Sequence, residues 1–145
     1  MFLIRPFAAG DVLPVSSIVR ESLAEVYPTS LYLDIHRWWR GGFLIAEWDG
    51  VVAGFLAAVV NGTQGARILM LAVTPRLRSQ GIGTALMNTF LRECTAASLL
   101  SVELEVRQSN VNAIRFYDRH GFSIKHDIPG FYTDGEAAWK MLRAL

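Results

Sequence analysis

A hydrophobic hairpin around Asp49-Gly50 constrains the fold of this chain more than any other feature. Two nearly uninterrupted apolar runs, Phe43–Trp48 and Val51–Val60, flank these two residues. An Asp-Gly pair between apolar runs is a strong signal for a tight β-hairpin. Strands that are apolar on both faces are buried on both faces. The sequence therefore predicts a hairpin that lies deep in a sheet and not at its rim.

Strands and helices alternate along the rest of the chain. The pattern of apolar residues and turn formers predicts further strands over 2–7, 67–73, 101–107, 122–125 and 138–142, and helices over 11–23, 31–40, 81–96 and 110–120. We expect the first strand at an edge, because Pro6 stops it. The length of 145 residues is that of one ordinary domain. The sequence thus predicts one α/β domain over 1–145, with helices on both faces of its sheet.

The composition excludes several classes of protein. With 52% hydrophobic residues and a mean hydropathy of +0.29, the chain does not have the composition of a disordered protein. A net charge of +1 and a pI near 7.9 argue against a nucleic-acid partner, because a nucleic-acid-binding domain usually has a pI above ~9. No apolar run reaches the ~20 residues that a membrane span needs, so we expect no membrane partner.

Cysteine and histidine usage adds two expectations. The single cysteine, Cys94, cannot form an internal disulfide, which fits a reducing compartment. The first residues lack the pattern of a secretory signal, and we therefore expect a cytoplasmic protein. The three histidines share no metal-ligand spacing, so we expect no metal. The high apolar content leaves a homodimer open as an alternative to a monomer.

The segment Arg76–Thr84, between a predicted strand and a predicted helix, carries the strongest functional signal. Gly81 and Gly83 let a ligand approach the backbone at the helix start, where N–H groups are unpaired. The helix dipole and the charges of Arg76 and Arg78 would favour a pyrophosphate there. A purely structural turn is an equally good interpretation of two glycines before a helix. A dinucleotide fingerprint needs a third glycine and a P-loop needs Gly-Lys-Ser/Thr, and both patterns are absent here.

Two segments together resemble a known family. The pattern Arg78-x-x-Gly81-x-Gly83 after a strand resembles the acyl-CoA-binding loop of the GNAT acetyltransferase superfamily. The segment over 104–122, LEVRQSNVNAIRFYDRHGF, is similar to the N-terminal (α-amino) acetyltransferases of the bacterial ribosomal-protein-alanine type and the archaeal type. The resemblance implies a mixed, mostly antiparallel twisted sheet whose splayed central strands hold acetyl-CoA. It further implies transfer of the acetyl group to the α-amino group of a protein N-terminus.

The resemblance also implies which residues hold acetyl-CoA. Backbone N–H groups in a bulge around Leu71-Ala72-Val73 would bind the thioester oxygen and pair with the pantetheine arm. Asn110 is either a helix cap or a further partner of that arm. The complete set expected to contact the cofactor is Leu71, Ala72, Val73, Arg78, Ser79, Gln80, Gly81, Ile82, Gly83, Thr84, Asn110 and Tyr117.

The chemistry needs a base only to the extent that the acceptor amine is protonated. An α-amino group has a pKa of ~7.7–8.0, so about a tenth of it is neutral at pH 7, whereas a lysine side chain has a pKa of ~10.4. One carboxylate acting through a water could therefore suffice for an N-terminal acceptor. Glu105, on the polar face of its strand, is the first candidate. Glu103 shares that face, and a solvated strand glutamate is the alternative interpretation of either residue.

Three further residues complete the predicted catalytic site. Glu25 is the rival base, because the segment over 23–28 resembles the Leu-Pro-Glu-Asn-Tyr-Pro of the archaeal and eukaryotic branch. Tyr117 would donate a proton to the departing CoA thiolate, although a tyrosine at that spacing also fits core packing. Tyr27 and Tyr132 resemble residues that flank the incoming peptide, with plain packing as the alternative.

The acceptor is less constrained than the chemistry. The segment over 131–141 resembles the Tyr-Tyr-x-x-Gly-Glu-Asp-Ala ending of these enzymes. The chain departs from the family pattern near the acceptor site at Ala24, Val26, Phe131 and Ala137. A small-molecule amine N-acetyltransferase on the same fold is therefore the alternative function. A non-catalytic acyl-CoA-binding module is a third, which the presence of both Glu105 and Tyr117 disfavours.

Overall fold

One mixed sheet forms the framework of the protein. The structure is a computed structural model and describes residues 1–23 and 25–145. Within this described part the strand order is β1-β2-β3-β4-β5-β7-β6. The strands are β1 (Phe2–Pro6), β2 (Phe43–Trp48), β3 (Val51–Asn61), β4 (Gly65–Val73), β5 (Ser101–Arg107), β6 (Ser123–Ile128) and β7 (Ala138–Ala144). The helices are α1 (Val12–Leu23), α2 (Thr29–Trp38), α3 (Ile82–Ala96) and α4 (Val111–Arg119), with short 3-10 turns at Ala9–Asp11, Arg40–Gly42 and Pro75–Leu77.

The predicted central hairpin is confirmed. β2 and β3 pair antiparallel and lie inside the sheet, while β1 forms one edge. Asp49 and Gly50 have positive φ angles of 50° and 82°, as the tight turn between two strands requires. Phe43, Ile45 and Phe55 are fully buried. Burial on both faces explains why these two strands are apolar along nearly their whole length.

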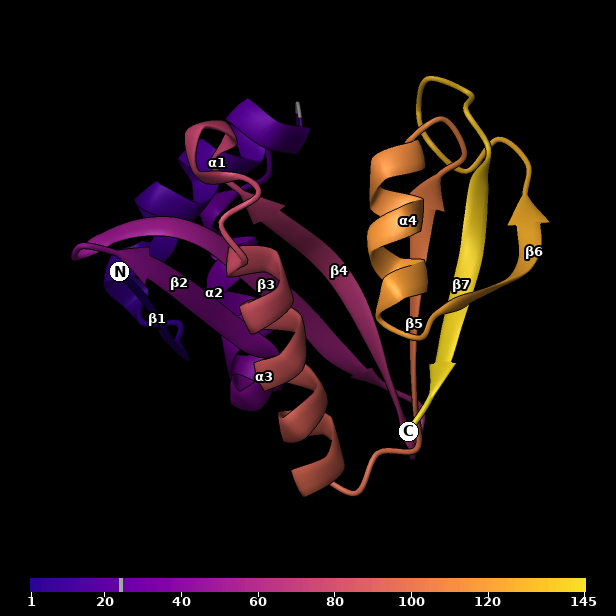
Figure 1. Cartoon of the computed structure of the whole chain (residues 1–145), viewed down its shortest axis with the longest axis horizontal. Helices are drawn as coiled ribbons and strands as arrows, with labels where there is room; N and C mark the ends of the chain where they lie inside the picture. Colours follow the sequence, from indigo (N-terminus) through magenta and orange to yellow (C-terminus); the bar gives the residue numbers. More distant parts are fainter. Residues whose placement is uncertain (24) are drawn as a thin grey trace.

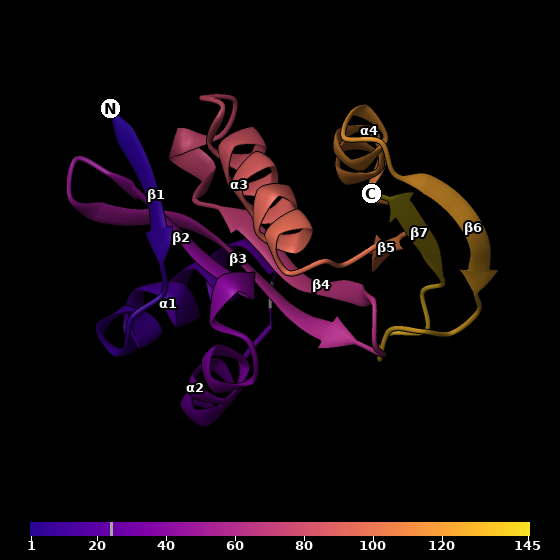
Figure 2. The same cartoon turned by 90° about the horizontal axis from the view of Figure 1, so that it is seen from below.

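Helices cover both faces of the sheet, as predicted. Figure 2 shows α1 and α2 on one face and α3 and α4 on the other. The face under α1 and α2 holds one buried cluster, which includes Val15, Tyr32 and Ile35. The face under α3 holds a second buried cluster, which includes Leu86 and Phe90. Among the helices of the described residues, none has the length and apolarity that crossing a membrane requires.

The sheet splits between β4 and β5. These two strands pair in parallel only from Gly65↔Ser101 to Arg67↔Glu103, and both continue beyond that point. Figure 1 shows the two strands diverging into a V, with α3 beside one arm and α4 beside the other. The predicted splayed central strands are therefore confirmed. Among the residues that the structure describes, no strand pairs with the edge of β4 beyond Arg67 on the side of the opening.

The β-bulge lies elsewhere than expected. The sequence resemblance put it around Leu71-Ala72-Val73, but these residues pair regularly with β3. The register instead shifts where Ala57 pairs with Met70 and Ala58 with Ile68, so Leu69 is the extra residue. A bulge reverses the alternation of side chains along a strand. Ile68 and Met70, which would share one face in a regular strand, therefore pack into the buried clusters on opposite faces of the sheet.

Several element ends differ from the prediction by a few residues. The helix expected over 31–40 covers 29–38, because Trp39 is extended with φ −161° and cannot continue it. The strand expected over 122–125 covers 123–128, since Phe122 turns into the core and is 1% exposed. β3, β4 and β7 each extend beyond the predicted limits by one to two residues. None of these shifts changes the order of the elements.

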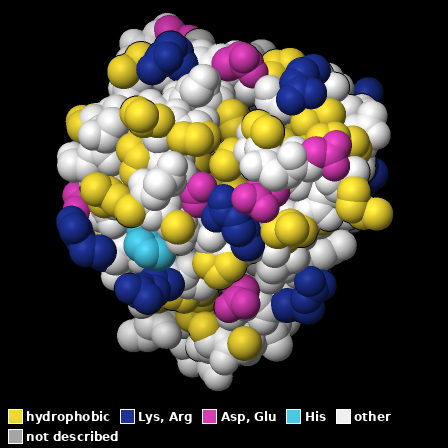
Figure 3. All heavy atoms as spheres, turned by 90° about the vertical axis from the view of Figure 1, so that its left-hand side faces the viewer, with side chains coloured by type: hydrophobic (Ala, Val, Ile, Leu, Met, Phe, Trp, Pro, Cys, Tyr) yellow, Lys and Arg dark blue, Asp and Glu magenta, His cyan; other side chains and the backbone are white. Residues whose placement is uncertain are grey.

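On the exposed surface on the β1 side, neither positive nor negative charge predominates. Figure 3 shows basic, acidic and hydrophobic side chains interspersed over this face. This mixture agrees with the net charge of +1. It gives this face none of the basic stripe that nucleic-acid binding requires.

Candidate active site

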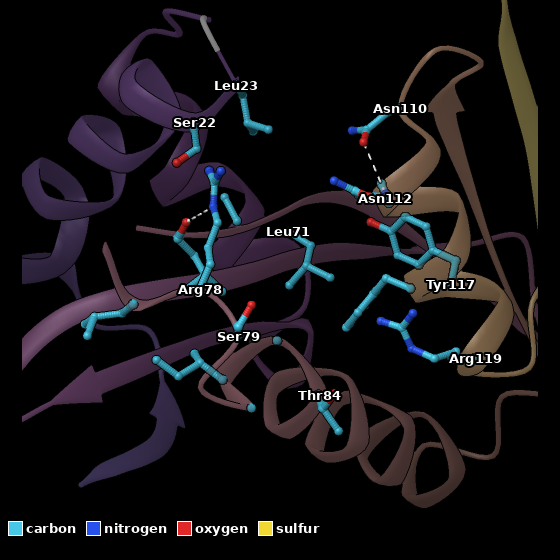
Figure 4. A pocket seen from close by; sticks show the side chains of 18 residues that line it. Ser22, Leu23, Leu71, Arg78, Ser79, Thr84, Asn110, Asn112, Tyr117 and Arg119 are labelled. Carbon is cyan, nitrogen blue, oxygen red and sulfur yellow. Dashed lines mark hydrogen bonds between the residues drawn. The ribbon is translucent and has the colours of Figure 1, made fainter. Parts of the chain in front are cut away.

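A cavity of about 480 Å³ occupies the split between β4 and β5. Four parts of the chain build its wall: the end of α1, the end of β4, the turn before α3, and α4 (Figure 4). Many of the residues predicted to hold acetyl-CoA line it, namely Leu71, Ala72, Val73, Arg78, Ser79, Gly81, Ile82, Gly83, Thr84, Asn110 and Tyr117. Gln80 is not among the lining residues. The structure thus brings together eleven of the twelve predicted positions, which lie far apart in the sequence.

The glycine turn has the backbone geometry of a ligand cradle. Gly81 precedes α3 with a φ of 84°, and no side chain caps the helix start. A φ in this region favours glycine, and the first N–H groups of a helix have no partners within the helix. At Gly83 an added Cβ would come within 3.3 Å of Phe116. One glycine therefore permits the turn, and the other permits α4 to pack closely against α3.

Arg78 is directed differently from what the sequence analysis expected. Its Nε donates a hydrogen bond to the carbonyl oxygen of Val73 at 3.1 Å, at the end of β4. Figure 4 shows the guanidinium on the side of Ser22, away from Ser79. Arg76 is not among the residues that line the cavity. The two arginines expected to supply charge to the glycine turn are therefore not directed into it.

The same hydrogen bond shows which backbone groups of β4 face the opening. The Thr74 N–H donates to Ala53 of β3, whereas the Val73 carbonyl points away from β3. Successive residues of a strand direct their backbone groups to opposite sides. The N–H and C=O of Leu71 and Val73 are thus expected to face the opening. These groups are available to an extended amide-containing ligand.

α4 contributes a helix cap and a buried phenol. The Asn110 side-chain oxygen accepts a hydrogen bond from the Ala113 N–H at 3.2 Å, so its predicted capping role is confirmed. The ring of Tyr117 packs edge-on against Phe116 and Phe122, at centroid distances of 5.4 Å and 5.7 Å. Burial raises the pKa of Tyr117 above its ordinary value. The phenol is therefore protonated at neutral pH, and it lines the cavity while also packing in the core.

Glu105 is not a solvated strand glutamate. Its side chain is only 6% exposed, and both of its carboxylate oxygens accept hydrogen bonds from cations. Arg67 Nε donates to one oxygen at 2.8 Å, and Arg67 Nη2 donates to the same oxygen. Lys140 Nζ donates to the other oxygen at 2.7 Å and reaches Glu103 at 3.1 Å. Because Arg67 is the last residue of β4 that pairs with β5, this network joins the two arms of the split at its base.

The predicted acceptor-binding residues come from two separate loops. Arg107 holds the β6–β7 loop, because its guanidinium carbon lies 4.0 Å from the centre of the Tyr132 ring and its Nη1 donates to Asp134 and Glu136 at 2.9 Å each. Burial raises the pKa of Tyr132, the charge of Arg107 lowers it, and the charges of Glu105, Glu136 and Tyr27 raise it further.

The remaining predicted positions on the acceptor side are less defined. Burial is also the main cause that raises the pKa of Tyr27, and the charge of Glu25 adds to it. Glu25 is thus near Tyr27 but is not among the residues that line the cavity. Ala24, one of the departures from the family pattern, lies outside the described residues. No trio of His, Cys, Asp or Glu side chains within 1–23 and 25–145 is placed to hold a metal ion.

The sequence analysis missed several residues that line the cavity. Ser22 and Leu23 come from the end of α1, and Asn112, Phe116 and Arg119 come from α4. The spacing of four and three residues puts Asn112, Phe116 and Arg119 on one face of the predicted helix, but this face is not the one that carries Asn110 and Tyr117, so helical spacing alone did not mark them. No local signal marks Ser22, since α1 reaches the cavity only through the packing of the whole sheet.

A comparison with protein families identifies the family to which this cavity-containing chain belongs. Residues 13–122 match the model of the acetyltransferase (GNAT) family. The chain belongs to the GNAT family. The matched segment contains every part of the chain that lines the cavity, from the end of α1 to α4. The protein is accordingly an N-acetyltransferase.

Individual relatives match nearly the whole GNAT chain. It is 39% identical over 142 residues to an uncharacterized N-acetyltransferase of Methanocaldococcus jannaschii, which covers 97% of this chain and 90% of that protein. It is 31% identical over 153 residues to the catalytic subunit of the N-terminal acetyltransferase B complex of Arabidopsis thaliana, covering 100% of this chain and 86% of that protein. The crystal structure of Ard1 from Thermoplasma volcanium is 41% identical, with a TM-score of 0.96 over 99% of this chain and 97% of that one.

Proposed function

We propose that this GNAT enzyme transfers the acetyl group of acetyl-CoA to the α-amino group of a protein N-terminus. The observation that carries the proposal is the cavity in the split sheet, which runs from the glycine turn to Tyr117 along an unpaired strand edge. A diphosphate, an amide-rich arm and a thioester need these three features in this order. The name of the Arabidopsis thaliana relative supports an N-terminal acceptor.

The cofactor would lie along the cavity in an extended form. The unpaired N–H groups of the turn and of the first residues of α3 would bind its diphosphate. The backbone of Leu71 and Val73 would pair with its pantetheine amides as an added strand pairs with a sheet edge. Asn110, whose side-chain oxygen already caps α4, would contact the arm through its amide group. The thioester would then come to rest beside Tyr117.

The reaction is a nucleophilic substitution at the thioester carbonyl. The neutral amine forms a bond to the carbonyl carbon, and β4 N–H groups stabilise the negative charge that develops on oxygen. Cleavage of the carbon–sulfur bond releases CoA as a thiolate. Tyr117 donates its proton to that sulfur, and a water accepts the proton that the amine loses.

Glu105 and Glu25 are both proposed as acceptors of that proton through the water. Glu105 accepts hydrogen bonds from Arg67 and Lys140, and its charge contributes to the raised pKa of Tyr132 on the acceptor side. Glu25 lies near Tyr27. An α-amino group needs only weak assistance, because a substantial part of it is already neutral at pH 7. The two variants Glu105→Gln and Glu25→Gln would show which carboxylate limits kcat.

Peptides that differ in their first residue, incubated with acetyl-CoA, test the acceptor. We expect mass spectrometry to place the added acetyl group on the α-amino nitrogen. Turnover of a free polyamine with none of any peptide would instead favour the small-molecule alternative, to which Val26, Phe131 and Ala137 point. A protein N-terminus as acceptor is compatible with the expected cytoplasmic location, and the oligomeric state is open between monomer and homodimer.

A further inference from the structure

Arg119 is a cation in the cavity that the mechanism above does not use. It is the last residue of α4 and lines the cavity on the wall opposite β4. Figure 4 shows its guanidinium extending from α4 into the space above Thr84. An exposed basic side chain that lines a cavity and extends into it is suited to a negatively charged ligand.

Three other cations near the split already have carboxylate partners. Arg67 and Lys140 bind Glu105, and Arg107 binds Asp134 and Glu136. In contrast, across the part of the chain that the structure describes, Arg119 makes no ion pair with a carboxylate. Its charge is therefore not neutralised by the protein itself.

Neither of the two arginines next to the glycine turn is directed into it. The Arg78 guanidinium is bound at the end of β4, and Arg76 does not line the cavity. The end of α4 lies next to the start of α3, because His120 Nε2 is 3.3 Å from Thr84 Oγ1. Arg119, the neighbour of His120, thus faces the first turn of α3 from the opposite wall.

We propose that Arg119 binds a phosphate group of the coenzyme across the cavity from the glycine turn. This inference rests on the proposed use of acetyl-CoA. A guanidinium presents several N–H donors in a planar fork that matches a phosphate, and it retains its charge at any physiological pH. Coenzyme A carries two phosphate sources, the diphosphate and the 3′-phosphate, and the chemistry of recognition is the same for both. Arg119 and the backbone N–H groups of the turn would then hold the nucleotide end from two sides.

Calorimetric titration of Arg119→Gln and Arg115→Gln with coenzyme A tests the proposal. Arg115 is the matched control, because it is an exposed arginine one turn earlier on the same helix and does not line the cavity. We expect R119Q to weaken binding roughly tenfold, as for loss of a charge-assisted hydrogen bond, and R115Q to leave it unchanged. Arg119→Lys, which retains the charge but not the fork, should fall between wild type and R119Q. Thermal unfolding of each variant verifies that it is folded.

Two shortened ligands identify the phosphate. If R119Q loses affinity for coenzyme A but not for dephospho-CoA, Arg119 binds the 3′-phosphate. If it loses affinity equally for both, but not for phosphate-free pantetheine, Arg119 binds the diphosphate. Equal binding of coenzyme A by R119Q, R115Q and wild type would overturn the role of Arg119 and leave the proposed function intact. Absence of coenzyme A binding to the wild-type protein would overturn both.

Discussion

Two side chains of the site, Tyr117 and Glu105, have environments that determine what each can do. Tyr117 is a phenol in an apolar setting, so burial keeps it protonated and able to donate. The Glu105 side chain is 6% exposed and has two cationic partners, Arg67 and Lys140. Each can therefore be tested by removing one functional group and leaving the packing in place.

Removal of the Tyr117 hydroxyl should lower kcat without weakening CoA binding. We expect Tyr117→Phe to reduce kcat by about 10²-fold, the usual contribution of a positioned acid. The raised pKa also predicts that the wild-type rate does not fall through Tyr117 deprotonation at any pH below 10.0, its ordinary pKa. Steady-state kinetics from pH 7 upward would measure both effects. Tyr32→Phe, which alters a buried tyrosine outside the cavity, is the control, and equal rates of the two variants would contradict a proton-donor role.

Removal of one cation from Glu105 should destabilise the fold. Lys140→Met leaves a carboxylate that is 6% exposed with only Arg67 as its partner. We expect a loss of about 1–3 kcal/mol in the free energy of unfolding, measured by urea denaturation. Glu103→Gln is the control, because Glu103 is more exposed and should cost less than about 1 kcal/mol. Equal stability of K140M and wild type would show that Lys140 does not hold Glu105.

At the scale of elements, the turn between β4 and α3 links backbone conformation to ligand binding. Gly81 has a φ of 84° and open space around its Cα, so a substitution there adds strain without a steric clash. Gly62, in the β3–β4 turn, has a φ of 72° and equally open surroundings, but it does not line the cavity. This pair separates the effect of strain from the effect on the ligand.

Replacing Gly81 should impair both stability and CoA binding, whereas replacing Gly62 should impair only stability. We expect Gly81→Ala and Gly62→Ala each to cost about 1–2 kcal/mol in the free energy of unfolding, because a Cβ is unfavourable at positive φ. Only G81A should also raise the Kd for coenzyme A, since its turn presents the N–H groups. Calorimetry and denaturation on both variants would measure this, and an unchanged Kd for G81A would exclude the turn as the diphosphate site.

At the scale of the whole molecule, the sheet has two arms that diverge on either side of the opening between β4 and β5. Backbone pairing joins β4 to β5 only at the base of the split, and the Arg67–Glu105 bridge also lies there. A ligand that pairs with the free edge of β4 and contacts α4 would join the two arms. Binding should therefore stabilise the entire fold and not only the glycine turn.

Coenzyme A should raise the melting temperature of the protein. At a concentration of 100 times its Kd, a ligand that binds only the folded state adds ~2.7 kcal/mol. For a chain of this size, this corresponds to an increase in Tm of roughly 5–10 °C. Differential scanning calorimetry with pantetheine as the weaker-binding control would measure it. No shift at millimolar coenzyme A would contradict the assignment of the cavity as a CoA site.

Local patterns in the sequence determined the helices and strands, and they also determined the glycine turn and the start of α4, which lie on two sides of the cavity. Asp49-Gly50 between apolar runs defines a hairpin, Gly81 and Gly83 define a turn that accepts a ligand, and Asn110 caps a helix. Each of these depends on residues a few positions apart, where dihedral preferences and hydrogen-bonding capacity act without the rest of the chain. The order of the strands and the location of the site at their split agree with this local information.

Only the tertiary structure decided what surrounds each charged group. Glu105 was the first candidate for the base, with a solvated strand glutamate as the alternative, and the sequence did not reveal its partners Arg67 and Lys140, which come from strands that are distant in the sequence and adjacent in the sheet. Arg78 was expected at the glycine turn, and instead binds the end of β4 and leaves Arg119 to face that turn. The physical reason is range: a local pattern specifies backbone conformation, whereas the charge and burial around a side chain depend on every element packed against it.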